Sequence, residues 1–219
     1  MNTALKIVES DTVVLDPLRE ITKEEREPYY IRERFLGTMT YMFKELALRI
    51  PELKPLVHNQ KREGINKGQW GFYGVYVQTV TTLAILMTRL NLKSIVDLGS
   101  GPGFVMYGIK YMVDKANVLG FEIEKELINH SVLGFGNIKY QDILKVTKKQ
   151  LADRDCIFFY EPFYDRGLAK QFAQRLNKVC TSGQYIFYAQ AGSIGSEMQL
   201  TKRIKLVGGC SELQIYKVD

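Results

Sequence analysis

The sequence predicts an α/β fold with a doubly wound, mostly parallel seven-stranded sheet, a C-terminal antiparallel hairpin and an N-terminal helical extension. Three observations lead to this prediction. Five short strand-like runs alternate with segments of helical periodicity after residue 90, which is typical of a parallel sheet. Two further runs flank a glycine-rich turn near the C-terminal end. One long helical pattern dominates residues 1–74, so we expect an extension there and a ligand-binding domain over 75–219.

The composition indicates an ordinary globular protein. The 219 residues suit one α/β domain with a modest extension, and no apolar run is long enough to cross a bilayer. Three scattered cysteines indicate reduced, mostly buried thiols, so we expect a cytoplasmic location. His58 and His130 lack metal-ligand spacing, so we expect no metal site. The formal charge of +6 favours an acidic partner only weakly, because 30 basic residues are interspersed with 24 acidic ones.

The extension begins with a helix signal. Thr22-x-x-Glu25 has the form of a capping box, and the main helix is expected between Pro28 and Pro51. Six apolar residues recur along this helix at spacings of three or four: Ile31, Phe35, Met39, Met42, Leu46 and Ile50. We expect this stripe to pack into the core, with a groove for a partner as the alternative.

Residues 51–74 are rich in glycine and proline and contain the only tryptophan. Trp70 and Tyr73 stand close to glycines, and aromatic side chains there suit a lid that closes over a flat or cationic ligand. A hydrophobic plug for the core explains the same residues equally well. Residues 75–90 then keep helical spacing over a length that exceeds most strands, so we expect a helix.

The next stretch is the most informative part of the chain. A short apolar run at 94–98 predicts a buried strand, and Asp-x-Gly-x-Gly-x-Gly occupies residues 97–103. Glycine tolerates positive φ and lets the backbone come close to a ligand. A dinucleotide-binding loop would have glycine in place of Phe104, and the Gly-Lys-Ser/Thr of a phosphate-binding P-loop is missing.

Acidic residues end the next two predicted strands. Glu122 lies in the run 117–123, 19 positions beyond Gly103, and a carboxylate at such a place can accept hydrogen bonds from both hydroxyls of a ribose. Asp142 ends the run 138–142 in the same way. A surface acid that starts the next helix is the alternative for Glu122. The spacing therefore favours a nucleoside ligand at this edge of the sheet.

Together these residues resemble motif I and the acids that follow it in the class I, Rossmann-like S-adenosylmethionine (SAM) methyltransferases. The resemblance covers about residues 75–219 and implies SAM as the cofactor. It implies that the glycine loop passes beneath the methionine part, with one acid near its ammonium group, one on the ribose and one on the adenine amine. The implied cofactor-binding residues are Asp97, Gly99, Ser100, Gly101, Gly103, Glu122 and Asp142, with Trp70 and Tyr73 as a lid.

A second motif follows the run 156–160, which predicts a central strand. It reads Glu161-Pro162-Phe163-Tyr164 and stands where the family carries motif IV, beside the methyl group. Enzymes that methylate an adenine amine have Asp/Asn-Pro-Pro-Tyr/Phe there, and the departures here argue against a nucleobase. The resemblance implies that Glu161, Phe163 and Tyr164 face the acceptor, with Glu161 orienting the nucleophile or accepting its proton. A helix-capping role for Glu161 is the alternative.

The predicted function is SAM-dependent methyl transfer to a nucleophilic acceptor. The resemblance implies that the accepting atom is an amino nitrogen. The order of Phe72-Tyr73-Gly74, a helix and motif I is similar to the non-SET histone lysine methyltransferases, which favours a protein lysine. A nucleic-acid base methyltransferase and a non-catalytic SAM-binding module are the alternatives. An oxidoreductase with a nicotinamide cofactor is disfavoured by Phe104. The sequence leaves the acceptor and the oligomeric state open.

Overall fold

The computed structural model describes residues 16–56, 77–131, 137–189, 193–199, 201, 203–210 and 213–219. Trp70 and Tyr73, with most of the glycine-rich stretch that contains them, lie outside the described residues. The predicted lid therefore stays a prediction.

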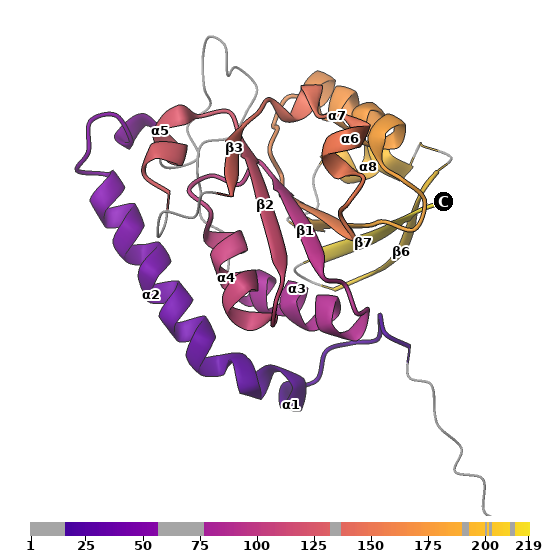
Figure 1. The fold of residues 1–219 in the computed structure, drawn as a ribbon, viewed down its shortest axis with the longest axis horizontal. Helices are drawn as coiled ribbons and strands as arrows, with labels where there is room; N and C mark the ends of the chain where they lie inside the picture. Colours follow the sequence, from indigo (N-terminus) through magenta and orange to yellow (C-terminus); the bar gives the residue numbers. More distant parts are fainter. Residues whose placement is uncertain are drawn as a thin grey trace, which may run out of the picture.

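Seven strands form one sheet in the order β3-β2-β1-β4-β5-β7-β6 (Figure 1). The five parallel strands are β1 (Ser94–Leu98), β2 (Asn117–Glu122), β3 (Ile138–Tyr140), β4 (Cys156–Tyr160) and β5 (Tyr185–Ala189). The last two, β6 (Ile204–Gly209) and β7 (Leu213–Val218), run antiparallel to each other, and β7 pairs antiparallel with β5. This arrangement confirms the predicted fold class.

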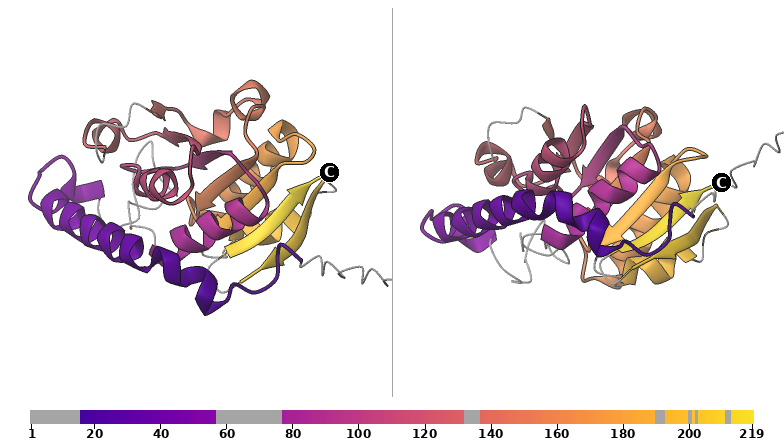
Figure 2. Two further views of the ribbon diagram at one scale, coloured as in Figure 1. Left: turned by 60° about the horizontal axis from the view of Figure 1, so that its bottom comes forward. Right: turned by 90° about the horizontal axis from the view of Figure 1, so that it is seen from below.

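Helices cover both faces of the sheet (Figures 1 and 2). On one face lie α1 (Lys23–Arg26), α2 (Tyr30–Ala47), α3 (Val77–Arg89) and α4 (Phe104–Met112). On the other lie α6 (Lys148–Leu151), α7 (Arg166–Val179) and α8 (Ser193–Gln199). Helix α5 (Lys125–Asn129) contacts β2 and β3, and 3₁₀ turns occupy η1 (Glu27–Tyr29), η2 (Lys54–Leu56) and η5 (Ile143–Lys145).

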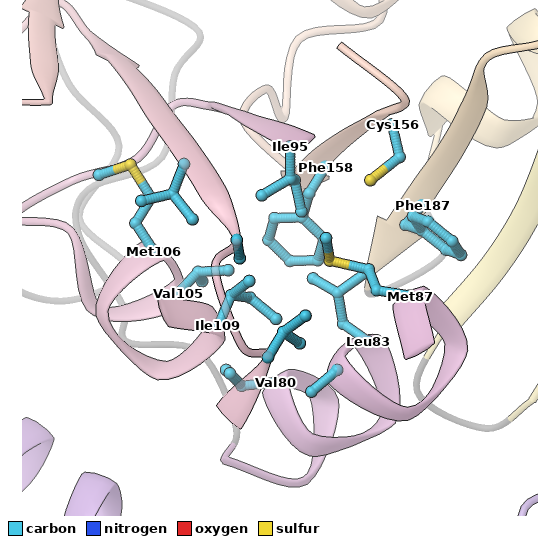
Figure 3. Packing of buried hydrophobic residues seen from close by; sticks show 14 of the residues in the cluster. Val80, Leu83, Met87, Ile95, Val105, Met106, Ile109, Cys156, Phe158 and Phe187 are labelled. Atoms are coloured by element: carbon cyan, nitrogen blue, oxygen red, sulfur yellow. The ribbon is translucent and has the colours of Figure 1, made fainter. Parts of the chain in front are cut away.

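The central strands are apolar throughout because both of their faces are covered. Successive residues of a strand point to opposite faces, so Ile95 and Phe158 pack toward α3 and α4, whereas Val96 belongs to the layer beneath α7. Figure 3 shows Met87 of α3 and Ile109 of α4 converging on Ile95 and Phe158. These two apolar layers hold the carboxyl ends of the parallel strands in register.

Arg89 forms hydrogen bonds between the sheet domain and the start of the N-terminal extension. The capping box predicted at Thr22 and Glu25 is present, with each side chain accepting from the other's backbone N–H. Arg89, at the end of α3, donates to both carboxylate oxygens of Glu25 and to the backbone carbonyl of Arg19. These charged hydrogen bonds lower the pKa of Glu25 to about 2.

The expectation that the α2 stripe packs into the core is wrong for four of its six residues. Ile31, Phe35, Met42 and Leu46 are 79%, 47%, 64% and 55% exposed. The helix instead buries a second apolar stripe, which contains Leu36, Phe43 and Ala47. The apolar period predicts a helix, but it does not decide which of two stripes meets the core.

Close packing on Gly108 of α4 explains the orientation of α2. A Cβ atom at Gly108 would lie 2.8 Å from Cδ2 of Leu36 and 2.6 Å from Cγ1 of Val80. Only glycine leaves room for Leu36 at this crossing, so Leu36 sets the buried side of α2. The helix begins at Tyr30, after a 3₁₀ turn that contains Pro28, and ends at Ala47, before Pro51.

Replacing the charge of Glu25 should weaken the attachment of the extension. We expect Glu25→Gln to lower the free energy of unfolding by about 1 kcal/mol at neutral pH, because an ion pair with Arg89 becomes a neutral contact. The pKa of Glu25 is lowered from 4.5 to about 2. The stabilisation is therefore complete above the unfolded value and is lost as pH falls toward the folded value.

Urea titrations of the two proteins at neutral pH and at about pH 3 measure this difference. The matched control is Glu20→Gln, which removes a nearby exposed carboxylate and should change stability little. A loss that persists unchanged through strongly acidic pH, or one that Glu20→Gln reproduces, would contradict the role of the Arg89 pair.

Candidate functional site

The candidate site lies where the strand order reverses. Strand β1 pairs with β2 on one side and with β4 on the other. The chain leaves β1 for α4 on one face of the sheet, whereas it leaves β4 for α7 on the other face (Figure 1). The two connections diverge at the carboxyl ends of these strands, and open α/β sheets bind their ligands at such a point.

The loop after β1 has the backbone that the alternating glycines predict. Gly99, Gly101 and Gly103 have φ values of 87°, 54° and 94°, which other residues adopt only at a cost. The backbone N–H groups of Gly99 and Ser100 both donate to the carbonyl of Phe121, at 2.8 and 3.0 Å. Gly103 is the N-cap of α4, and no side chain caps this helix end. The positive end of α4 is therefore directed toward the loop.

Glu122 joins this loop to the end of β2. Its Oε2 accepts from the backbone N–H of Gly101 at 2.7 Å, and its Oε1 accepts from Ile123 at 2.7 Å and Glu124 at 2.9 Å. The side chain is buried at 7% exposure. Three backbone donors satisfy a charged carboxylate well. The structure thus shows Glu122 supporting the glycine loop, and its role toward a ribose stays a prediction.

Asp97 lies buried beside Glu122 without comparable support. Its residue is 3% exposed, and among the described residues its Oδ2 has no hydrogen-bond partner. Burial, and then the neighbouring charge of Glu122, raise the pKa of Asp97 well above its usual value. The hydroxyl of Ser100, three positions later, is also buried and without a partner in the same part of the chain. A buried carboxyl and hydroxyl in this state fit a ligand that brings a cation and hydrogen bonds.

Gly120 was not identified from the sequence, although it shapes the same site. It pairs with Asp97 across β1 and β2, and a Cβ atom there would lie 2.6 Å from Oγ of Ser100 and 2.6 Å from Cε of Met106. The missing side chain therefore leaves space for the Ser100 hydroxyl. An isolated glycine inside a strand pattern is the signal that could have revealed it.

Asp142 follows β3 and caps a 3₁₀ turn. Its Oδ1 accepts from the backbone N–H of Leu144 at 2.9 Å, and its Oδ2 lies 3.4 Å from Nζ of Lys145. The backbone N–H of Gln141 donates to the carbonyl of Glu122 at 2.8 Å, which keeps Asp142 near the end of β2. The predicted contact of Asp142 with adenine stays a prediction.

The residues after β4 separate into two groups. Phe163 is 1% exposed and packs edge-to-face on Phe172, with ring centroids 5.5 Å apart. The structure therefore corrects the expectation that Phe163 faces an acceptor, because the core beneath α7 surrounds it. Glu161 and Tyr164 are half-buried at the end of the strand.

This segment also approaches the glycine loop. A Cβ atom on Gly99 would lie 3.8 Å from Cβ of Pro162, in ordinary contact. The predicted alternative, in which Glu161 caps the next helix, does not hold. The N-cap of α7 is Asp165, whose Oδ1 accepts from the backbone N–H of Leu168 at 2.9 Å. Pro162 thus lies beside the loop after β1, and Glu161, which precedes it at the end of β4, does not cap α7.

The described residues contain no group of three or more His, Cys, Asp and Glu side chains that could hold a metal ion. His130 is exposed, with Nδ1 2.9 Å from the carbonyl of Glu126, and His58 lies outside the described ranges. None of the described helices is both long enough and apolar enough to cross a membrane.

Comparisons with known proteins support the fold. No family model matches the chain, and a search of curated proteins finds no match. The SAH-bound structure of the methyltransferase PaMTH1 from Podospora anserina has a TM-score of 0.56 at 10% identity, covering 94% of this chain and 100% of that one. A Staphylococcus aureus protein assigned as a caffeoyl-CoA O-methyltransferase has a TM-score of 0.51 at 13% identity, covering 86% and 100%.

Identities this low establish the fold alone. The architecture is that of the class I SAM-dependent methyltransferases, with a mostly parallel sheet that ends in an antiparallel pair. The match to PaMTH1 extends over nearly the whole chain, so it includes the N-terminal extension as well as the sheet domain.

Asp97→Asn should stabilise the protein in the absence of a ligand. The raised pKa means that the folded state resists ionisation of Asp97, whereas the unfolded chain ionises it above the usual value of 3.8. Wild-type stability therefore falls as pH rises through that value, and a neutral side chain of the same shape avoids the loss. We expect a gain of about 1–3 kcal/mol at neutral pH and no gain below about pH 3.8.

Thermal and urea unfolding at both pH values measure this gain. The matched control is Asp155→Asn, because Oδ2 of Asp155 accepts from the backbone N–H groups of Lys93 at 2.7 Å and Ser94 at 2.8 Å. That substitution removes a charge that is well bonded, so it should lower stability. If Asp97→Asn were as destabilising as its control, the buried carboxyl would not be the unsatisfied group described above.

Proposed function

We propose that the protein is a SAM-dependent methyltransferase. One observation carries the proposal: within the described part of the chain, Oδ2 of Asp97 and Oγ of Ser100 are buried without hydrogen-bond partners at the start of the positive-φ loop. The loop stands at the reversal of strand order, where a ligand would meet these atoms. The fold shared with methyltransferases supports the same conclusion.

The chemistry of SAM fits the groups that surround this loop. Its ammonium supplies the cation that Asp97 lacks, and its α-carboxylate suits the backbone N–H groups at the start of α4. Glu122 lies at the end of β2, where a carboxylate can accept from ribose hydroxyls, although it would have to share its oxygens with Gly101. Asp142 would accept from the adenine amine.

The chain's own residues would act by binding and positioning. When bound, SAM supplies an electrophilic methyl group on a sulfonium. The residues after β4 reach the glycine loop, so Glu161 and Tyr164 would orient the acceptor toward that methyl group. A carboxylate such as Glu161 can also accept the proton that the nucleophile gives up. Phe163 has no direct part in the proposal and supports this segment from the core.

We further propose an amino nitrogen as the acceptor, with a protein lysine as the first candidate. The carboxylate of Glu161 supports this choice, because it complements the positive charge of an approaching amine. The likeness of the sequence around motif I to lysine methyltransferases supports it as well. In the proposed domain organisation, residues 75–219 form the SAM-binding domain, and residues 1–74 form the helical extension and contain the lid.

Calorimetric titration with SAM tests the cofactor site. We expect at least tenfold weaker affinity, about 1.4 kcal/mol, in Asp97→Asn, Gly101→Arg and Glu122→Ala. Asp97→Asn is the decisive variant, because it should lose affinity while it gains stability, which a folding defect cannot produce. The control Asp114→Asn removes an exposed acid just after α4 and should bind as the wild type does. Unchanged affinity in both Asp97→Asn and Glu122→Ala would count against the site.

Transfer of a labelled methyl group tests the activity and the acceptor together. The protein is incubated with radiolabelled SAM and a cell extract that is afterwards separated into protein, RNA, DNA and small molecules. We expect label in the protein fraction, on lysine after hydrolysis, and at least a tenfold loss with Glu161→Gln. Label in RNA or DNA would replace the lysine proposal with a nucleic-acid acceptor. Binding of SAM without transfer to any fraction would support a non-catalytic module instead.

A further inference from the structure

The outer face of α2 carries a large apolar surface. We call it the outer stripe, and it consists of Tyr30, Ile31, Phe35, Tyr41, Met42 and Leu46 on α2 together with Tyr111 on α4. These side chains are 44% to 79% exposed. Figures 1 and 2 show α2 along the outside of the molecule, so that one side of the helix faces away from the sheet. This inference does not depend on the proposed function.

The outer stripe is held in a fixed position. On its opposite side α2 buries Leu36 against α3 and α4, which sets the rotation of the helix. Phe35 lies against Tyr111, with ring centroids 6.0 Å apart, and Tyr111 stacks on Tyr107 at 6.1 Å. The guanidinium of Arg32 lies 5.4 Å from the centre of the Tyr111 ring. A surface ordered in this way loses little conformational entropy when a partner binds.

The outer stripe is also large enough for a stable interface. A side chain of this size has roughly 200 Å² of accessible surface, so the exposed fractions of 44% to 79% add up to roughly 800 Å². Each partner in a standard protein–protein interface buries about 800 Å². The largest apolar patch of a typical monomer is smaller, at about 300–600 Å².

Two charged residues within the outer stripe indicate what covers it. Arg34 and Glu45 are 11 positions apart, which is close to three helical turns, so they lie on the same side of the helix, near opposite ends of the stripe. In the part of the chain that the structure describes, neither side chain forms an ion pair. Two copies of α2 that run antiparallel bring Arg34 of each copy toward Glu45 of the other. A parallel pairing would place like charges together.

The apolar residues are distributed with almost the same symmetry. Phe35 and Met42 are equally distant from a centre between Thr38 and Met39, as are Ile31 and Leu46, and this centre is one residue before the midpoint of Arg34 and Glu45. An antiparallel two-fold near Thr38 and Met39 therefore brings Phe35 of one copy toward Met42 of the other, twice. Thr38, at the centre, is small and lets the two helices approach closely. A surface that complements itself under a two-fold axis is the requirement for a symmetric dimer.

We propose that the outer stripe is the contact surface of a homodimer in which the two α2 helices run antiparallel. Each end of the interface carries one Arg34–Glu45 pair, and the apolar side chains between them exclude water. The charged pairs set the antiparallel direction, and the apolar contacts supply most of the affinity.

Sedimentation equilibrium of the full chain tests the proposal. We expect a concentration-dependent dimer for the wild type and a dissociation constant at least tenfold higher for Phe35→Glu, which places a charge in the centre of the contact. The control Lys170→Glu changes an exposed charge on α7, across the sheet from α2, and should dimerise as the wild type does. Circular dichroism melts confirm that each variant folds.

Charge exchange tests the antiparallel direction. Arg34→Glu alone and Glu45→Arg alone should each weaken the homodimer, because each puts like charges at both ends. An equimolar mixture of these two variants should recover dimers, since both ends of the mixed dimer then pair opposite charges. A wild type that stays monomeric at high micromolar concentration overturns the proposal and assigns the stripe to a different partner. A dimer that neither Phe35→Glu nor the charge variants weaken overturns it as well.

Discussion

Two carboxylates end neighbouring strands at the centre of this fold, and only one of them is satisfied. Glu122 accepts hydrogen bonds from the backbone N–H groups of Gly101, Ile123 and Glu124, and it thereby fixes the glycine loop to the end of β2. Asp97 is buried beside it with an oxygen that finds no partner among the described residues. Burial, and then the neighbouring charge of Glu122, raise the pKa of Asp97 well above its usual value. The proposed cationic ligand would supply the positive charge that this pair of carboxylates lacks among the described residues.

The same arrangement explains why stability and binding should oppose each other at Asp97. A neutral residue there would suit the protein alone, whereas an acid suits a cationic ligand. The glycines shape the backbone around the same residues. Positive φ at Gly99, Gly101 and Gly103 turns the loop after β1, and Gly120 leaves space for Ser100.

The sequence predicts the features that depend on local chemistry. The run at residues 94–98, the alternating glycines after it and the apolar strand at 156–160 each have one conformation that their residues favour, and the structure shows it. The capping box at Thr22 is a local signal of the same kind. The acid at the end of β2 could also be placed, because its spacing from the loop follows from one helix and one strand.

Features that depend on packing between distant segments could not be predicted in this way. Helix α2 has two apolar stripes, and the contact of Leu36 with Gly108 decides which of them is buried. Phe163 and Tyr164 both follow β4 in the sequence, so the sequence does not distinguish them. In the structure Phe163 packs against Phe172 in the core. Helix α4 connects the two surfaces discussed above, because it begins at the glycine loop and carries Tyr111 near its other end.

A crystal structure of the protein with SAM or its demethylated product most directly tests the claim that Asp97 binds the cationic group of a ligand. The account predicts the ligand in the crevice between the ends of β1 and β4, with its ammonium nitrogen about 3 Å from the carboxylate of Asp97. It also predicts that the glycine loop keeps its backbone and that Glu122 accepts from a ribose hydroxyl while it keeps its hydrogen bond from Gly101. A crevice that stays empty at saturating ligand, or an ammonium group bound away from Asp97, would contradict it.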